Sequence, residues 1–321
     1  MELVSKPELS IILITYNQSA YIEQAINGLL SQDYDFNKIQ IIVADDCSTD
    51  DTFDKVKTIF NTSNIKNIKY LERDKNLGIT LNYRRSISAC DGEYIAILEG
   101  DDYWTSISKL SKQIRLLKRR KEFIACGSNY YIFSTQECKF SLRINSINGY
   151  TAINCHQLVD DNLPGNFSTM VYRSEALKAL PSGIFSLRAF DWIFHILMTQ
   201  HSQLCVLHEP MSVYRVHSNG QWSGLTNINK QIQMADDVES YIPFCEPHVQ
   251  KLLYKKLGVL RKNIKLLRLP FILRVFSASY MRLIVIMSIP PIVRKVVHLI
   301  TPPIVWFGIA KIKQTFFNKR G

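Results

Sequence analysis

The sequence predicts an α/β fold in which a mostly parallel sheet is flanked by helices. Two observations lead to this prediction. Short apolar runs rich in β-branched residues are typical of strands buried on both faces, and they alternate with stretches whose apolar residues recur at the helical period. Such alternation is typical of strand–helix–strand units with parallel strands. The composition, with 46% hydrophobic and 21% charged residues, fits a folded protein of 321 residues.

The first hundred residues contain four predicted strands separated by three predicted helices. The run LSIILIT at 9–15 is the first strand. In the following segment, YIEQAINGLLSQ at 21–32, apolar residues recur as on one face of a helix. The further elements predicted here are strands at 39–45, 68–72 and 94–99 and helices at 52–60 and about 79–89.

Beyond residue 102 the pattern is less regular. A basic helix is predicted at 109–121 and a strand at 123–133, followed by a polar loop region that reaches about residue 163. Later elements are a strand and then a helix within 165–177, a helix at 189–200, and a strand running into a loop at 212–223. We expect this domain, 1–225, to end there and the remainder, 226–321, to form a separate region.

The net charge of +11 comes from the end of the chain, because residues 251–321 contain fifteen Lys and Arg and no Asp or Glu. Leucines and isoleucines at helical spacing predict an amphipathic basic helix at 251–269. The apolar runs at 283–293 and 296–310 are shorter than the roughly 20 residues of a spanning helix. We expect this basic helical extension to associate with an anionic membrane surface. The alternative is an appendage that packs on the domain or on an oligomer partner.

The cysteines and the N-terminus indicate the compartment. Seven scattered cysteines without a Cys-x-x-Cys pair favour a reducing environment, and the start, MELVSKPELS, lacks the features of a signal peptide. We therefore expect a cytoplasmic protein, peripheral on the inner face of the cell membrane. No nucleic-acid recognition motif accompanies the basic charge, so nucleic acid is not an expected partner.

Polar clusters follow three of the predicted strands, namely TYN at 15–17, DDCSTDDT at 45–52 and EGDD at 99–102. Ligands of parallel sheets bind outside the carboxyl ends of the strands. The glycine-rich loops of dinucleotide enzymes and P-loop ATPases are missing. If a nucleotide binds here, a divalent cation held by carboxylates would neutralise its phosphates.

Six segments in this order resemble the family 2 glycosyltransferases with the GT-A fold, over roughly residues 9–223. They are LSIILITYN, DDCSTDDT, NLGITLN, EGDDYW, FDW and YRVH. The resemblance implies a Rossmann-like sheet with a nucleotide-sugar half at about 1–102 and an acceptor half at about 103–225. It also implies an inverting enzyme that moves one sugar from a nucleotide-sugar donor, favoured to be a UDP-sugar, to a hydroxyl of a glycan. The Q-x-x-R-W motif of the processive members is absent, since the corresponding region is YRVHSNGQW, so we expect a non-processive enzyme. Taken with the basic tail, it favours a lipid-linked acceptor and bacterial surface polysaccharide biosynthesis (O-antigen, capsule or lipopolysaccharide).

The resemblance places a metal site in EGDDYW and YRVH. It implies that Asp101 and His217 hold Mn²⁺ or Mg²⁺ against the donor's diphosphate, that Asp102 supports the metal or contacts the donor, and that Arg215 pairs with phosphate. Glu99 stands where many members of the family have Asp, so its role is open. The competing interpretation is an acidic turn that caps the following helix.

The same resemblance assigns the donor pocket. Asp45 and Asp46 are expected beside the base and ribose, with Asp46 the better candidate for hydrogen-bonding a uracil-like edge. Capping of the next helix explains part of DDCSTDDT in any case. The other expected donor-binding residues are Thr15, Tyr16, Asn17, Asn76, Gly78 and Asn82.

Asp191 in FDW is the expected catalytic base, because inverting transfer requires a proton acceptor on the acceptor side. Phe190 takes the place that an acid often has in the family, and Trp104 and Trp192 are expected on the acceptor side. The simpler interpretation of Asp191 is a helix cap. Two other functions stay open: a nucleotidyltransferase that makes sugar nucleotides, and a catalytically silent nucleotide-sugar-binding module.

Overall fold

The computed structural model describes residues 6–63, 65–218, 220 and 224–268. Two compact units divide the chain, Met1–Arg261 and Lys262–Gly321, and the sheet belongs to the first. The apolar runs predicted at 283–293 and 296–310 lie outside the described residues. Within the described part of the chain, no helix has the length and apolar character needed to cross a membrane.

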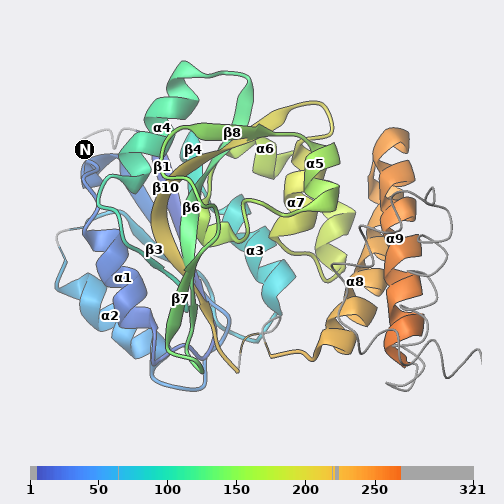
Figure 1. Cartoon of the computed structure of the whole chain (residues 1–321). Helices are drawn as coiled ribbons and strands as arrows, with labels where there is room; N and C mark the ends of the chain where they lie inside the picture. Colours follow the sequence, from blue (N-terminus) through green and yellow to red (C-terminus); the bar gives the residue numbers. More distant parts are fainter. Residues whose placement is uncertain (1–5, 64, 219, 221–223, 269–321) are drawn as a thin grey trace, which may run out of the picture. The chain divides into compact units, whose positions relative to one another are not determined.

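Four parallel strands form one half of the sheet, in the order β3-β2-β1-β4, with helices on its faces (Figure 1). Every residue of β1 and β2 is buried, as expected for strands covered on both faces. The register sets Thr15 beside Asp45 and Ile14 beside Glu99, so the polar clusters meet at one edge. The elements of this half are β1 Leu9–Thr15, α1 Ile22–Leu30, η1 Phe36–Lys38, β2 Ile39–Asp45, α2 Thr52–Asn61, β3 Ile68–Tyr70, α3 Ile79–Ser88 and β4 Tyr94–Glu99.

The second half of the sheet is mixed. Strand β9 is antiparallel to both β4 and β6, β10 runs parallel to β6, and β5 is antiparallel to β10. The predicted α/β class is thus confirmed. The four strands of the first hundred residues are parallel to one another, whereas beyond them the parallel pair β6 and β10 is joined by antiparallel neighbours. The further elements are β5 Tyr103–Trp104, α4 Lys109–Arg119, β6 Phe123–Ser134, β7 Lys139–Leu142, β8 Tyr150–Ile153, α5 Cys155–Asp160, η2 Phe167–Thr169, β9 Val171–Arg173, α6 Ser174–Lys178, η3 Ser182–Ser186, α7 Asp191–Met198 and β10 Gln203–Val216.

The prediction of a polar loop up to about residue 163 is wrong, because this segment contains β7, β8 and α5. Strand β8 pairs with the start of β10, and only its last residue, Ile153, is buried, so no apolar alternation marks it. Helix α5 has only six residues, and a capping box of Asn154 and Gln157 stabilises its N-terminus. Strand β10 also begins nine residues before the predicted start at 212, because polar residues and Pro210 interrupt its apolar pattern.

Two helices follow the sheet, α8 Asn227–Tyr241 and, after η4 Ile242–Phe244, α9 Pro247–Arg268. The amphipathic helix predicted at 251–269 is therefore present. Its apolar face is covered by protein as far as Leu260, since Val249, Leu253, Leu257 and Leu260 are buried. The compact unit consequently extends beyond residue 225 to Arg261. A functional division near 225 stays a prediction.

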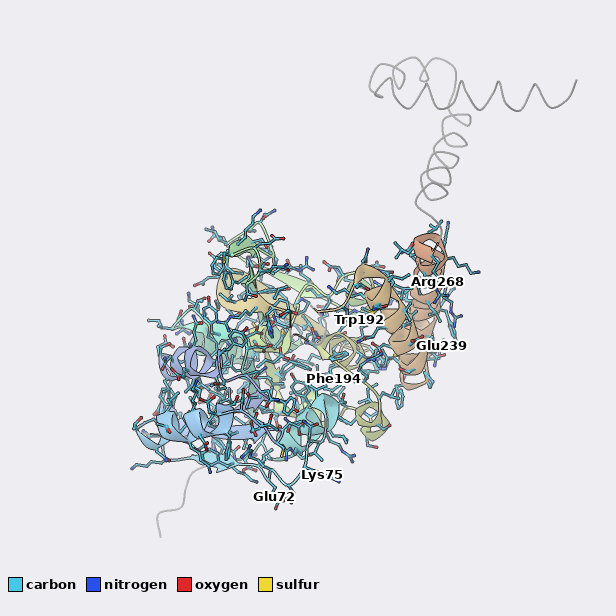
Figure 2. All side chains as sticks on the ribbon, turned by 90° about the horizontal axis from the view of Figure 1, so that it is seen from below. Glu72, Lys75, Trp192, Phe194, Glu239 and Arg268 are labelled. Carbon is cyan, nitrogen blue, oxygen red and sulfur yellow. The ribbon has the colours of Figure 1, made fainter. Side chains whose placement is uncertain are left out.

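Most charged side chains lie on the surface of the domain, and most large apolar side chains lie in its interior. Charged residues such as Glu72, Lys75 and Glu239 point outward, whereas Phe194 of α7 lies inside and is fully buried (Figure 2). Helix α7 is mostly buried, unlike the amphipathic surface helices. Its first residue, Asp191, is thus carried on a rigid, well-packed element.

Candidate active site

A cavity of about 610 Å³ opens at the carboxyl ends of the parallel strands. This volume is in the range of pockets that bind small ligands. Segments from both halves of the sheet and from α8 and α9 surround it. The predicted site residues that line it are Thr15, Tyr16, Asn17, Asp46, Asn76, Gly78, Asn82, Asp101, Asp191, Trp192, Arg215 and His217.

Asp101 and His217 meet at the wall of the cavity, although 116 residues separate them. The short strand β5 begins just after Asp102 and pairs antiparallel with β10, which places the EGDD turn beside the end of β10. As a result, Oδ2 of Asp101 lies 3.1 Å from Nε2 of His217. A carboxylate oxygen and an imidazole nitrogen at this separation fit a divalent cation such as Mn²⁺.

Two more carboxyl groups stand beside this pair. Oε1 of Glu99 accepts a 2.8 Å hydrogen bond from the hydroxyl of Tyr83, and Oδ1 of Asp102 accepts one of 2.9 Å from the backbone N–H of Arg215. Burial, followed by the charges of the neighbouring acids, raises the pKa of both carboxyls well above the ordinary value. Gathering negative charge at this corner is costly, and a bound cation would relieve it.

The guanidinium of Arg215 is already engaged within the protein. It donates to the backbone carbonyl of Asp101 and to the side chain of Gln24. Its Cζ atom lies 4.7 Å from the ring centre of Tyr21 and 4.9 Å from that of Tyr103. These contacts make Arg215 a positioning residue for Asp101, and pairing with phosphate would require it to leave them.

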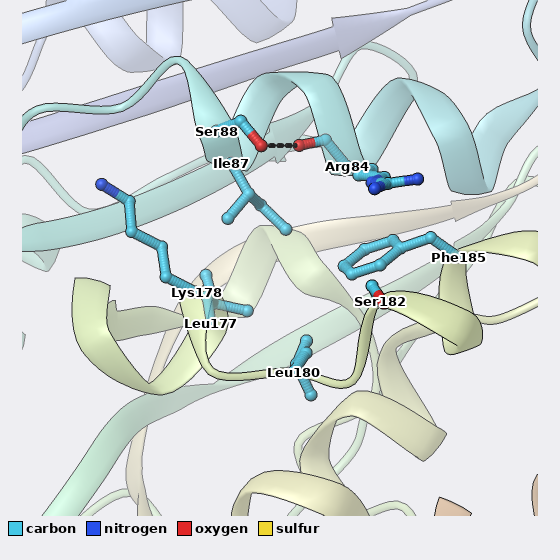
Figure 3. Close-up of a pocket in the computed structure, with 8 residues that line it drawn as sticks. All are labelled: Arg84, Ile87, Ser88, Leu177, Lys178, Leu180, Ser182 and Phe185. Carbon is cyan, nitrogen blue, oxygen red and sulfur yellow. Dashed lines mark hydrogen bonds between the residues drawn. The ribbon is translucent and has the colours of Figure 1, made fainter.

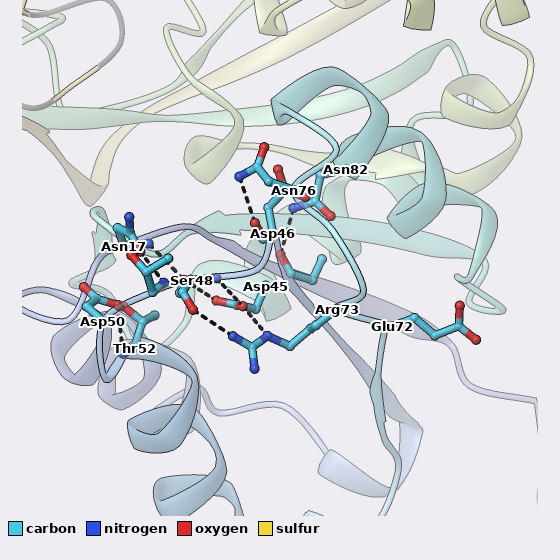
Figure 4. A network of polar contacts seen from close by, with 12 residues as sticks. Asn17, Asp45, Asp46, Ser48, Asp50, Thr52, Glu72, Arg73, Asn76 and Asn82 are labelled. Carbon is cyan, nitrogen blue, oxygen red and sulfur yellow. Dashed lines mark hydrogen bonds and ion pairs between the residues drawn. The ribbon is translucent and has the colours of Figure 1, made fainter.

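The two acids at the end of β2, Asp45 and Asp46, have different surroundings (Figure 4). Asp45 is fully buried and pairs with Nε of Arg73 at 2.5 Å. Asp46 instead reaches the segment before α3, where it accepts hydrogen bonds of 2.9 and 2.8 Å from the backbone N–H groups of Leu77 and Gly78. Gly78 has φ = +79°, which suits glycine. Asp46 therefore fastens the 76–78 segment to the rim of the cavity.

Asp191 faces the cavity from the first turn of α7. Its Oδ2 atom accepts a 2.8 Å hydrogen bond from Nδ2 of Asn162. Burial raises the pKa of Asp191 to about 7, against hydrogen bonds from Asn162 and the backbone at the helix start, which lower it. The N-cap of α7 is Phe190, and no side chain caps this end of the helix, so the interpretation of Asp191 as a helix cap is wrong. A carboxyl with this pKa is suited to exchange a proton near neutral pH.

Residues 10–180 match the family model described as Glycosyl transferase family 2. The chain belongs to this family. It is 30% identical to the uncharacterized protein Rv1520 of Mycobacterium tuberculosis over 214 residues, which cover 67% of this chain but only 60% of that relative. It is 37% identical over 132 residues to the Escherichia coli UDP-Glc:alpha-D-GlcNAc-diphosphoundecaprenol beta-1,3-glucosyltransferase WfaP, covering 41% of this chain and 47% of WfaP.

Solved structures confirm the GT-A fold predicted for this family 2 glycosyltransferase. Staphylococcus aureus TarS 1–349 in complex with UDP-GlcNAc superposes with a TM-score of 0.59 at 19% identity, over 82% of this chain and 76% of that one. The mannosyltransferase PcManGT from Pyrobaculum calidifontis, in complex with GDP-Man and Mn²⁺, gives a TM-score of 0.57 at 15% identity, over 87% and 80%. At such identities the likeness concerns the fold alone.

Three of the predicted residues do not line the cavity of this glycosyltransferase. Asp45 and Asp102 are buried beneath its wall and hold neighbouring segments in place. Trp104 is 3% exposed, and its Nε1 donates a 2.8 Å hydrogen bond to the carbonyl of Ser168. The acceptor-side position expected for Trp104 is therefore wrong, because β5 directs this ring into the core.

Several lining residues escaped the sequence analysis. Asn162 lies in the stretch taken for a loop, and Asp237 and Tyr241 come from α8, beyond the expected end of the domain. Asp237 also pairs with the guanidinium of Arg188 at 2.7 Å. Only the polar stretch DDNLPGN at 160–166 offered a signal for Asn162.

A second hollow of about 300 Å³ lies between α3 and the α6–η3 segment (Figure 3). Ile87, Leu177, Leu180 and Phe185 form most of its wall, with Arg84 and Lys178 at its sides. None of the predicted site residues lines it, so the larger cavity is the candidate active site.

Proposed function

We propose that this family 2 glycosyltransferase moves one sugar, with inversion, from a nucleotide-sugar donor to a hydroxyl of a lipid-linked glycan. One observation carries the proposal: Asp191, with a pKa near 7, opens into the same cavity as the Asp101–His217 pair. A proton acceptor and a cation-binding pair in one cavity suit the two ends of a displacement reaction.

The donor would lie along the carboxyl ends of β1, β2 and β4. Thr15, Tyr16 and the 76–78 segment held by Asp46 would enclose the base and ribose. The diphosphate would then reach Asp101 and His217, which would hold Mn²⁺ or Mg²⁺ there. When bound, the cation would neutralise the charge that develops on the departing nucleoside diphosphate. A UDP-sugar is favoured, because the names of WfaP and of the TarS complex both include UDP-sugars.

The acceptor would enter from the side of α5, α7 and α8. Its hydroxyl would give its proton to Asp191 as the bond to the anomeric carbon forms and the bond to the diphosphate oxygen breaks. Trp192 lines this side, with Nε1 fixed by a 2.6 Å hydrogen bond to the carbonyl of Leu158. WfaP acts on a diphosphoundecaprenol-linked sugar by its name, and TuaG of Bacillus subtilis is named for putative teichuronic acid biosynthesis. The name of WfaP favours a lipid-linked acceptor, and the name of TuaG favours a role in polysaccharide biosynthesis.

Calorimetry followed by a transfer assay tests this function. The full-length protein is titrated with UDP-Glc, UDP-GlcNAc, dTDP-Glc and GDP-Man in Mn²⁺ and in EDTA, and nucleoside diphosphate release is then measured with and without a diphosphoundecaprenol-linked sugar. We expect metal-dependent binding of one donor and release that depends on both acceptor and Asp191. Tight donor binding without release on any lipid-linked acceptor would instead indicate a silent binding module.

We further propose that the basic C-terminal region holds the enzyme on the anionic cytoplasmic face of the membrane. Because α9 packs on the domain as far as Leu260, the informative truncation ends at Arg268 and leaves this helix intact. The full chain should sediment with phosphatidylglycerol-containing vesicles at low salt, and the truncated form should stay in the supernatant. Equal sedimentation of both forms would reject this role for residues 269–321.

A further inference from the structure

Three side chains that could bind a metal ion lie close together apart from the cavity, with Cys155 buried and the two histidines exposed. Cys155 and His156 are the first two residues of α5, and His248 is the second residue of α9. One ligand atom from each lies within 4.8 Å of the other two. None of the three lines the cavity, and none belongs to a motif that the sequence analysis singled out.

The spacing of these ligand atoms is close to the spacing of ligands around a bound metal ion. Sγ of Cys155 lies 3.9 Å from Nε2 of His248, and the rings of His156 and His248 stack with their centres 5.7 Å apart. Ligands bonded to tetrahedral zinc at about 2.0–2.3 Å lie roughly 3.3–3.8 Å from one another. Small rotations of the two exposed imidazoles would therefore bring all three atoms onto one ion.

Donors for a fourth position are also nearby. The ring centre of His201 lies 6.2 Å from that of His248, and Nε2 of His201 is 3.9 Å from Oε1 of Glu246. Both side chains are at least half exposed. Either group, or a water molecule, would complete a four-coordinate shell.

We propose that Cys155, His156 and His248 form a second cation site, which takes a thiophilic or borderline metal ion such as Zn²⁺. The choice of metal follows from the ligands, because thiolate and imidazole favour Zn²⁺ and Co²⁺, whereas carboxylate and carbonyl oxygens favour Mg²⁺ and Mn²⁺. The enzyme would thus hold two cations of different chemistry, one at Asp101 and one here.

The position of this site gives it a structural consequence. Helix α5 already meets α9 through the Nζ atom of Lys256, which donates a 2.8 Å hydrogen bond to the carbonyl of Val159. The carbonyl of Leu158, also in α5, fixes Trp192 at the cavity. A metal joining the first turns of α5 and α9 would fasten the acceptor wall to α9 and stabilise it.

Cobalt spectroscopy tests the site without substrate or turnover. Full-length protein, kept reduced with a phosphine, is titrated with Co²⁺ and then with Zn²⁺ against a chromophoric chelator. We expect one equivalent of Co²⁺ to give a thiolate-to-metal charge-transfer band, Zn²⁺ to abolish it, and Zn²⁺ to raise the unfolding temperature. Cys155→Ser and His248→Ala each remove a ligand and should weaken Zn²⁺ binding more than about 100-fold. Loss of a residue that only supports a ligand costs about 10–100-fold in metal affinity.

Two further variants make the outcome decisive. His156→Ala removes an exposed ligand, so a folding defect would not obscure its effect, and Cys138→Ser removes an exposed cysteine outside the cluster. The charge-transfer band should weaken in the first and persist in the second. A band that survives Cys155→Ser, or no band in the wild-type protein, overturns the proposal. Neither result bears on the glycosyltransferase function, because the measurement requires no donor.

Discussion

The side-chain amide of Asn162 donates a hydrogen bond of 2.8 Å from Nδ2 to Oδ2 of Asp191. The orientation of this amide is set on both sides, since Nδ2 also donates to the carbonyl of Gly165 and Oδ1 lies 3.4 Å from Nδ1 of His195. Burial lowers the pKa of His195 to about 3, so its ring stays neutral at working pH. Asp191 is therefore held by an oriented neutral dipole, and burial remains the main influence on its pKa.

Replacing the proposed base tests its role in the reaction. Asp191→Asn keeps the size of the side chain but cannot accept the proton, so we expect kcat to fall about 10²–10⁴-fold. Donor affinity should change little, because Asp191 is assigned to the acceptor side. Single-turnover transfer and calorimetry measure the two quantities, and Asp54→Asn on the exposed face of α2 is the control. Wild-type turnover in a folded Asp191→Asn protein would remove the base assignment.

The pH dependence follows from the same group. As the proposed base, Asp191 would accept a proton only when ionised, and its pKa is about 7 because burial raises it. We therefore expect kcat/KM, which reports the free enzyme, to be constant above this pKa and to decrease tenfold per pH unit well below it. Rates between pH 5.5 and 9 with a subsaturating acceptor measure this limb. A flat profile down to pH 5.5 would contradict a base with this pKa.

Removing the amide contact should move that limb. Asn162→Ala takes away a hydrogen bond that favours the ionised form of Asp191, and hydrogen bonds to charged groups contribute about 1.5–3 kcal/mol. We expect the midpoint to rise by about one pH unit, with reduced kcat at pH 7 and partial recovery at pH 9. The matched control is Asn61→Ala at the exposed end of α2. An Asn162→Ala enzyme that is equally impaired at every pH would have lost packing, not tuning of the base.

Metal dependence should reside in the carboxylate–imidazole pair. Asp101→Asn removes the negative charge of the carboxylate whose Oδ2 lies 3.1 Å from Nε2 of His217. We expect affinity for Mn²⁺ to fall more than about tenfold. Donor affinity in Mn²⁺ should then approach that of the wild-type protein in EDTA. Calorimetry of both proteins, with the exposed Asp74→Asn as control, provides the comparison. Equal donor affinity of the wild-type protein with and without Mn²⁺ would reject the metal site itself.

The first hundred residues were predictable because their signals are local. A strand such as β1, buried along its whole length, is mostly apolar, with Ser10 and Thr15 its only polar residues. The residues that follow such a parallel strand reach the edge of the sheet where ligands bind. The prediction that Asp101 and His217 lie together came from the motif resemblance. Their separation of 116 residues gives no sign that β5 pairs with β10.

The part of the chain beyond residue 102 was less predictable because its elements depend on tertiary contacts. Helix α5 is six residues long, and β8 is half-exposed, so neither carries a clear periodicity. Asn162 matters through its contacts with Asp191 and His195, which no local pattern encodes. The prediction for Trp104 is wrong for a different reason. Its position in the motif suggested a ligand contact, whereas the pairing of β5 directs its ring into the core.

Asp46 offers a test that separates two roles at the proposed donor pocket. Its carboxylate accepts from the N–H groups of Leu77 and Gly78, so in Asp46→Asn the amide nitrogen would face one of these donors. Losing one such bond costs about 1–3 kcal/mol, and we expect donor affinity to weaken about tenfold. If Asp46 acts by fastening the segment, trypsin should also cleave after Lys75 faster than in the wild-type protein when no donor is present, while Asp51→Asn should leave both measurements unchanged. Weaker donor binding with unchanged cleavage would instead assign Asp46 a direct contact with the base, and unchanged donor binding would exclude both roles.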